Sequence, residues 1–307
     1  MKRMCVLMCV VLAAGTVLAQ EEEDVTYETT TTVSGGEDLM SQLWLLEDAT
    51  PLNTGQVDLR LGLRWMTASA PANLGDSSDD FVLTPSIVWG AHDNLELSLG
   101  VDAWLGDGGD KGPFEDGNYN TTVGLLWRFF EQTSTECGDG CLQLPSMALS
   151  ATAWTPTGCG SSGLDGELRL IMTYEYGNGV RSHFNVFAKS VGSTDYEGVE
   201  TLSQEARRSF LAGDDRFALD PRHFQYGAVI GGDGPLCADG AVRWVADYQY
   251  RSSYYYGRTG VHIAELGWEW DISDACRLGM SFLAGLDHSG DTPNFGASLV
   301  YSYSLVY

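Results

Sequence analysis

Apolar and polar residues alternate along the last nine residues of the chain, which end in an aromatic residue. Leu299, Tyr301 and Tyr303 share one face of an extended strand with Leu305 and Tyr307. Neighbouring residues of a strand point to opposite faces, so this alternation gives the strand one fully apolar face. Either a protein core or lipid must cover that face.

The same alternation recurs in eleven earlier segments. In the first of them, Leu59, Leu61 and Leu63 oppose Arg60 and Arg64. Each segment is about ten residues long, the length that a tilted strand needs to cross a bilayer. The twelve segments are 57–66, 81–90, 95–102, 119–130, 144–154, 167–176, 181–190, 222–231, 241–251, 260–270, 276–286 and 295–307.

The connections between these segments alternate in length. Tight turns such as Asp93-Asn94 and 271–274 separate connections that are mostly long. Bacterial outer-membrane barrels have short periplasmic turns and longer outer loops in this alternation. We therefore predict a transmembrane antiparallel β-barrel of about 12 strands over residues 54–307, closed between its last and first strands. A secreted β-sandwich is the alternative, but it would lack a continuous outer apolar band.

The N-terminus is typical of an exported protein. Lys2 and Arg3 precede a short apolar run and small residues, so residues 1–19 are predicted to be a signal peptide. Residues 20–53 are predicted to be an acidic periplasmic segment. Within it, residues 38–46 have leucines at helical spacing, which could lie at the periplasmic rim or enter the lumen. The predicted location is the outer membrane of a Gram-negative cell.

Charged residues fall on the face of the strands opposite the apolar band. An arginine facing lipid costs about 2 to 4 kcal/mol, so these charges are predicted to line the lumen. They allow either a polar conduit or an ionic plug that fills a narrow barrel, with ion pairs between neighbouring strands. The residues are Asp58, Arg60, Arg64, Glu96, Asp102, Arg128, Glu167, Arg169, Glu175, Lys189, Arg243, Asp247, Arg251, Glu265, Glu269 and Arg277.

The net charge of −25 excludes nucleic acid as a partner. Acidic loop residues 106–112 could hold calcium, but their spacing is not that of an EF-hand, which favours a solvated loop. We predict no metal and no cofactor. In the long 191–221 loop, Thr201 opens a capping box for a helix ending near Gly213, which either constricts the lumen or packs over its mouth.

Five cysteines follow the signal peptide, and an oxidising compartment makes disulfides the default. Cys137 with Cys141 is the first candidate pair and Cys237 with Cys276 is the second. Catalysis is not predicted, because no histidine has the serine two residues on that an outer-membrane phospholipase would need. Asp287-His288 could mimic part of an omptin-like protease site, but the strand count does not fit.

The stretch from Gly55 through Trp65, then 84–86, 89–90 and 93–97, resembles the outer-membrane barrels of the phenol-degradation meta-pathway transporter type. The match covers about the first third of the barrel and has Trp89 where tyrosine is common. This resemblance implies uptake of small solutes, with aromatic molecules as one candidate class, and transfers no catalytic residues.

Taken together, the sequence predicts an outer-membrane channel for passive passage of small solutes. The alternatives are a structural or surface-interaction barrel with a plugged lumen and, third, an outer-membrane hydrolase. The predicted partners are outer-membrane lipid, small-molecule solutes and the barrel-assembly machinery. The assembly machinery is expected to recognise the C-terminal signal formed by Tyr301, Tyr303, Leu305 and Tyr307.

Overall fold

The computed structural model describes residues 45–68, 78–106, 119–132, 144–155, 164–176, 179–190, 224–237, 240–252, 260–286 and 293–305. All of them belong to one compact unit, Gly35–Tyr307. Several predictions lie outside these residues: the signal peptide, the calcium loop, the helix at Thr201, the Cys137–Cys141 pair and the last residue, Tyr307. No helix among the described residues is long and apolar enough to cross a membrane.

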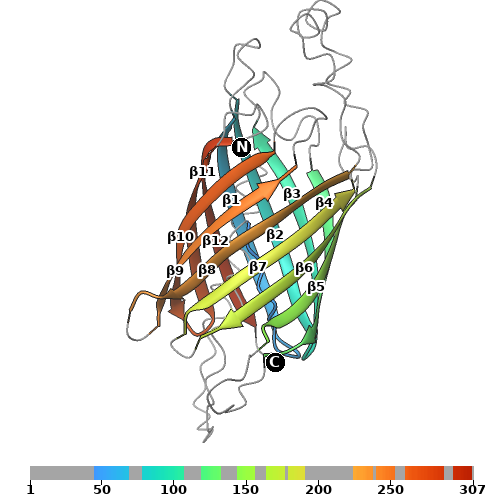
Figure 1. The fold of residues 1–307 in the computed structure, drawn as a ribbon, viewed down its shortest axis with the longest axis vertical. Coiled ribbons are helices and arrows are strands. Elements are labelled where there is room, and N and C mark those ends of the chain that lie inside the picture. Colours follow the sequence, from blue (N-terminus) through green and yellow to red (C-terminus); the bar gives the residue numbers. More distant parts are fainter. Residues whose placement is uncertain are drawn as a thin grey trace, which may run out of the picture. The chain divides into compact units, whose positions relative to one another are not determined.

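Twelve antiparallel strands form a closed barrel within the described residues (Figure 1). Every strand pairs with its neighbours in sequence, and the last pairs with the first, which confirms the predicted fold class. The strands are β1 Val57–Ala68, β2 Ser78–His92, β3 Leu95–Gly106, β4 Tyr119–Phe130, β5 Ser146–Thr155, β6 Asp165–Glu175, β7 Arg181–Ser190, β8 Phe224–Pro235, β9 Val242–Arg251, β10 Val261–Ser273, β11 Cys276–Gly285 and β12 Pro293–Leu305.

The two terminal strands close the barrel with their apolar residues in register. Leu59 pairs with Tyr303, and Leu61 pairs with Tyr301, on the outer face. The small residues Ser298 and Ser302 alternate with them and are buried on the inner face. The outer residues of β12 therefore continue the band of β1. Their predicted role as an assembly signal stays a prediction.

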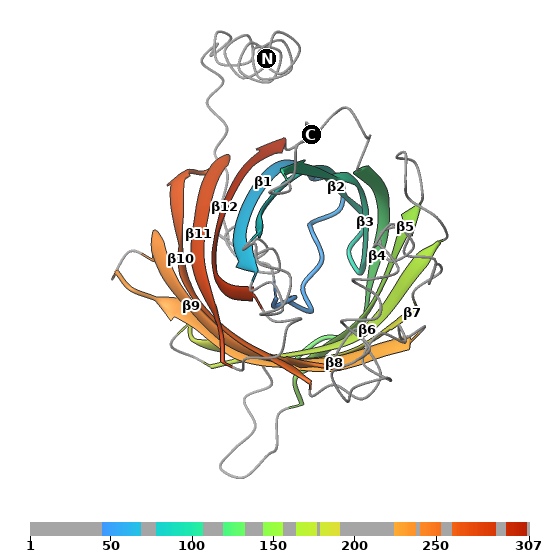
Figure 2. The same ribbon diagram turned by 90° about the horizontal axis from the view of Figure 1, so that it is seen from above.

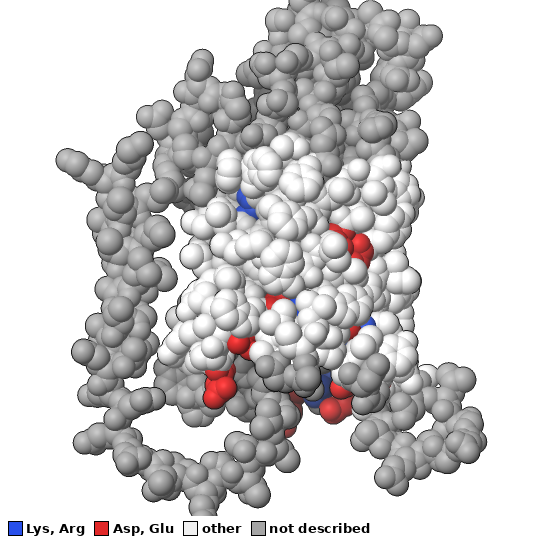
Figure 3. Space-filling view, turned by 90° about the vertical axis from the view of Figure 1, so that its left-hand side faces the viewer, with Lys and Arg blue, Asp and Glu red and all other residues white. Residues whose placement is uncertain are grey.

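Large apolar side chains remain exposed around the outside of the barrel. Figure 3 shows one side, on which charged side chains are few between the two ends. Water would make such a surface costly, whereas an outer-membrane barrel presents this band to lipid. The band includes Leu61, Ile87, Trp89, Leu99, Trp127, Leu168, Ile230, Leu266, Trp268 and Phe282.

Pro85 lies within β2 without shifting its register to β1, where it pairs with Leu61. On the other side, the paired positions with β3 pass from Leu83 to Ser86 and omit the two residues between them. Proline has no N–H to give to a ladder. Pro85 therefore interrupts one ladder without adding a residue to the strand.

Candidate functional site

The residues before β1 run inside the barrel. Residues 45–53, here called the inner segment, have no helix or strand and lie within the ring of strands (Figure 2, blue trace). Their side chains at Leu45, Leu46, Asp48, Ala49 and Leu52 are buried. The sequence left open whether this region lies at the rim or enters the lumen. Its described end enters the lumen.

Polar groups of the inner wall bind the backbone of the inner segment. Ala49 N–H donates to Thr173 Oγ1 at 3.0 Å, and Leu52 N–H donates to Glu96 at 3.1 Å. An irregular backbone can be buried only if such groups satisfy it. Three further bonds come from Arg169 to the Leu45 carbonyl (3.1 Å), from Asn185 to the Glu47 carbonyl (3.0 Å) and from Ser150 to the Glu47 carboxylate (2.8 Å).

Apolar side chains of the inner segment pack against two parts of the wall. Ala49 contacts a group formed by Leu126, Ala148 and Ile171. Leu45 and Leu46 belong to a larger group, called the apolar cluster, with Phe187, Val229, Val261, Ile263 and Leu283. This part of the lumen is apolar, a feature that the alternation of charges along the strands does not predict.

A glycine lets the inner segment pass close to β2. A Cβ atom on Gly90 would lie 2.0 Å from the carbonyl oxygen of Asn53 and 2.7 Å from that of Leu52. Gly55, with a φ of 86°, then turns the chain into β1 and donates its N–H to the Gly90 carbonyl at 2.8 Å. The left-handed φ at Gly55 is one that side chains resist. These two glycines fix where the inner segment meets the wall.

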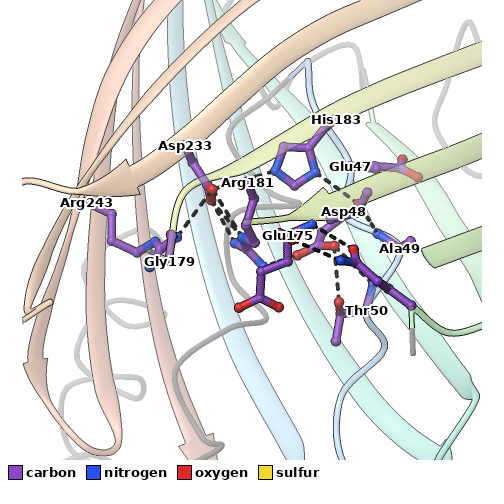
Figure 4. Close-up of polar contacts among 12 residues, drawn as sticks. Glu47, Asp48, Ala49, Thr50, Glu175, Gly179, Arg181, His183, Asp233 and Arg243 are labelled. Atoms are coloured by element: carbon purple, nitrogen blue, oxygen red, sulfur yellow. Dashed lines mark hydrogen bonds and ion pairs between the residues drawn. The ribbon is translucent and has the colours of Figure 1, made fainter. Parts of the chain in front are cut away.

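Two aspartates and two arginines fasten the inner segment near the end of the barrel where β7 begins. Asp48, only 1% exposed, forms an ion pair with Arg181. Arg181 also contacts Asp233 of β8 at 2.8 Å, and Arg243 of β9 lies 3.3 Å from the same carboxylate. Figure 4 shows these groups pointing toward one another. We call Asp48, Arg181, Asp233 and Arg243 the arginine cluster.

A histidine links this cluster to the inner segment. His183 Nδ1 is hydrogen-bonded to Thr173 Oγ1 at 3.0 Å, and the same oxygen accepts the Ala49 N–H. The other ring nitrogen, Nε2, lies 3.7 Å from Asp233. The order of hydroxyl, imidazole and carboxylate is that of a hydrolase triad. Here, however, Thr173 is buried beneath the inner segment and its oxygen is already bonded there.

Asp247 of β9 and Glu265 of β10, called the carboxyl pair, lie directly opposite each other on the inner face. They are 7% and 3% exposed. Ser281 donates to Glu265, and the Leu45 backbone also hydrogen-bonds to it. No N–H or hydroxyl group reaches either oxygen of Asp247 within the part of the chain that the structure describes.

The sixteen charged residues that the sequence assigns to the lumen all alternate in phase with the buried residues of their strands. Several pair within one strand as well as between strands. Asp58 binds Arg60 at 3.3 Å, Glu167 binds Arg169 at 2.7 Å, and Glu269 binds Arg277 at 3.4 Å. Asp102 accepts from Trp154 at 3.0 Å, and Lys189 lies over the same indole ring at 4.2 Å. Arg64 and Arg251 are half-buried.

Two of the sixteen lie at the end of the barrel that carries the tight turns. Arg128 binds Asn94 and the Asp93 carbonyl at the β2–β3 turn. Glu175 is exposed and exchanges two backbone hydrogen bonds with the Gln132 side chain. Glu175 is also the cross-strand partner of Arg181 in the β6–β7 ladder, so it adjoins the arginine cluster, whereas Arg128 belongs to the rim.

Of the arginine cluster, the alternation of charges predicts Arg243 as a lumen residue but leaves out Asp48, Arg181 and Asp233. Arg181 and His183 lie on the inner face of a segment whose boundaries were predicted, with the same alternation as Lys189. Asp233 follows a strand whose predicted end, at residue 231, is four residues short of the observed one. Extending that strand by one inward position would have found Asp233.

The predicted bond between Cys237 and Cys276 is absent, and both thiols are free. Cys237 follows β8 and Cys276 begins β11, so β9 and β10 lie between them. Three strand spacings of 4.7–4.9 Å amount to roughly 14 Å, about twice the Cα separation that a disulfide spans. Cys276 Sγ instead lies 3.4 Å from the Tyr301 hydroxyl.

No protein-family model and no curated protein sequence matches the chain. Solved structures do match in fold. An outer membrane channel from Pseudomonas putida F1 is similar with a TM-score of 0.57 and 14% identity, over 84% of this chain and 98% of that one. The CymD monoaromatic hydrocarbon channel has a TM-score of 0.43 and 10% identity, over 83% and 90%. Outer membrane phospholipase A from Escherichia coli has a TM-score of 0.38 and 17% identity, over 81% and 90%.

The first of these matches, the closed barrel and the outer apolar band lead to one conclusion. The chain is an outer-membrane β-barrel. Membrane lipid is therefore its partner along the outer face, and its function depends on the contents of the lumen.

Proposed function

We propose that this protein is a channel for passive passage of small solutes, and that the inner segment closes it in the conformation described here. The observation that carries the proposal is the way the inner segment is held. It is bound through side chains and single backbone bonds to β3, β5, β6 and β7 and is not added to the sheet as a strand. The segment can therefore leave the lumen without breaking a strand ladder.

Polar groups of the wall also support a wet lumen. Gln225 Nε2, Ser302 Oγ and Asn185 Oδ1 are buried and have no protein partner among the described residues. A buried polar atom without a partner costs about 1 to 3 kcal/mol, and this cost is recovered when the inner segment leaves and water enters the lumen. A permanent structural plug would gain by closing these bonds. One outer membrane channel of the same fold makes solute passage a function that this architecture can perform.

Conductance in a planar bilayer tests the proposal. A double variant of the inner segment, Leu46→Ser with Asp48→Asn, removes its apolar anchor and its ion pair without altering the wall. We expect this variant to conduct in larger or more frequent steps than the wild type. Asn53→Ala is the matched control, because Asn53 is an exposed residue of the same segment. It should behave as the wild type does.

A structural barrel gives a different result. In that case both the wild type and the double variant are silent, although both are folded, as a mobility shift of unboiled protein on a detergent gel would show. The proposal includes no catalytic step, since the Thr173 oxygen is bonded to the inner segment. Hydrolysis of a phospholipid or peptide by the wild type would contradict that part of it.

A further inference from the structure

The carboxyl pair differs from the other buried acidic groups of the lumen. Asp48, Asp58, Asp233 and Glu269 each form an ion pair with an arginine. Asp247 has no such partner among the described residues, and the group that acts on it is Glu265, both as a like charge and as a hydrogen-bonding carboxyl group. Like charges directly opposite each other in a sheet are destabilising, and burial increases the cost. A group that brings a positive charge into this site would offset that cost.

Apolar side chains adjoin the carboxyl pair. Leu283 of β11 is the direct cross-strand partner of Glu265. Ile263 lies two residues before Glu265, on the same face of β10. Both belong to the apolar cluster. The wall therefore presents acceptor oxygens and an apolar surface side by side, as pockets for amphipathic ligands do.

The inner segment already occupies this site with the same two kinds of group. The Leu45 backbone N–H bonds to Glu265, and the Leu46 side chain packs in the apolar cluster. Leu46 is 1% exposed. The Leu45 N–H and the Leu46 side chain thus occupy the positions that the donor and the apolar part of a ligand would take. The neutral amide does not reach the Asp247 oxygens, whereas an ammonium group with three N–H bonds could donate to both carboxyl groups.

We propose that the carboxyl pair and the apolar cluster form a binding site for a protonated amine that carries an apolar body. The inference rests on the proposed function, because the inner segment must leave before such a solute enters. It names the solute class that the channel selects. Leu45 and Leu46 then act as an internal competitor for the site.

Block of the channel current by 2-phenylethylammonium tests this proposal. The Leu46→Ser, Asp48→Asn protein serves as the open background, and 2-phenylethanol is the neutral probe of similar size. The amine is expected to reduce the current saturably and the alcohol is not. Adding Asp247→Asn should weaken the block about tenfold, the effect of losing one charge-assisted hydrogen bond. Glu265→Gln should act in the same direction.

Glu131→Gln is the matched control, because Glu131 is an exposed carboxylate at the rim. It should leave the block unchanged. Equal effects of amine and alcohol, or a block that Asp247→Asn does not weaken, would overturn the proposal. Such a result would leave the channel function standing and assign a shared proton to the carboxyl pair.

Calorimetry separates the two possible failures. If no protein conducts, the proposed function fails, and the same refolded proteins are titrated with 2-phenylethylammonium in detergent. Heat of binding that disappears with Asp247→Asn but not with Glu131→Gln supports the site. Its absence from the wild type and from the open background overturns the site.

Discussion

The arginine cluster and the carboxyl pair lie next to each other on one wall of the lumen. The acidic groups of the first are paired with arginines, whereas those of the second face each other. Asp233 pairs across the β8–β9 ladder with Val245, and Asp247 pairs with Gly231, two positions along the same face. Asp233 is enclosed by Arg181 and Arg243, whereas Asp247 faces another carboxyl group. The ion pairs of the arginine cluster fasten the inner segment. The carboxyl pair, which lacks an arginine, is the site at which we propose that a cation binds.

Substitution of Asp233 is expected to have the largest effect on stability. Asp233→Asn leaves Arg243 without its carboxylate and Arg181 with Asp48 alone, and removing one partner of a buried pair costs about 3 kcal/mol or more. We expect the free energy of unfolding to fall by that amount in a urea titration of the refolded protein followed by tryptophan fluorescence. Adding Arg243→Met should recover part of the loss. A loss well below 1 kcal/mol would mean that the cluster does not hold the wall together.

Gly90 tests whether the arginine cluster alone holds the inner segment. Gly90→Ala places a methyl group against backbone oxygens of Asn53 and Leu52, which cannot move aside as a side chain can. We expect a loss of about 2 kcal/mol and a larger open fraction in the bilayer, with both charged groups intact. Gly166→Ala is the control, since its Cβ meets nothing within 4 Å. Wild-type current from Gly90→Ala would show that the cluster suffices.

Asp247 should give the smallest effect and the opposite sign. Asp247→Asn replaces a buried carboxyl group that faces another acidic group with a neutral amide, so the free energy of unfolding is expected to rise by up to about 1 kcal/mol. The urea titration used for Asp233→Asn measures it under identical conditions. A decrease similar to that of Asp233→Asn would mean that Asp247 already has a stabilising partner, and the contrast between the two groups would be lost.

The fold could be predicted from the sequence because a strand crossing a membrane must repeat one pattern. Leu59 and Arg60 face lipid and lumen for the same reason that their counterparts do in every other strand. The pairing of charges could not be predicted in the same way. Among the described residues, Glu167 binds Arg169 of its own strand and not a residue across the ladder. This choice depends on side-chain conformation, which the alternation of residues along a strand does not determine.

The inner segment is where prediction from the sequence ends. Leu46 and Asp48 carry no repeat that relates them to a wall far along the chain, and Asp48 meets Arg181 only because the barrel closes. The apolar cluster was missed for a related reason. Val261, Ile263 and Leu283 have the parity of lumen residues, and they make sense inside a polar barrel only once Leu46 is placed against them.

The turn at Gly55 keeps the inner segment attached to the strand that begins beside it. A tethered group competes with free molecules at an effective concentration set by its linker, in the millimolar range for a short one. A solute must therefore be abundant, or bind more tightly than two leucines, before it displaces the segment. The length of the tether thus sets the amine concentration above which the inner segment is displaced. Under the proposed mechanism the channel stays closed below that concentration and conducts above it.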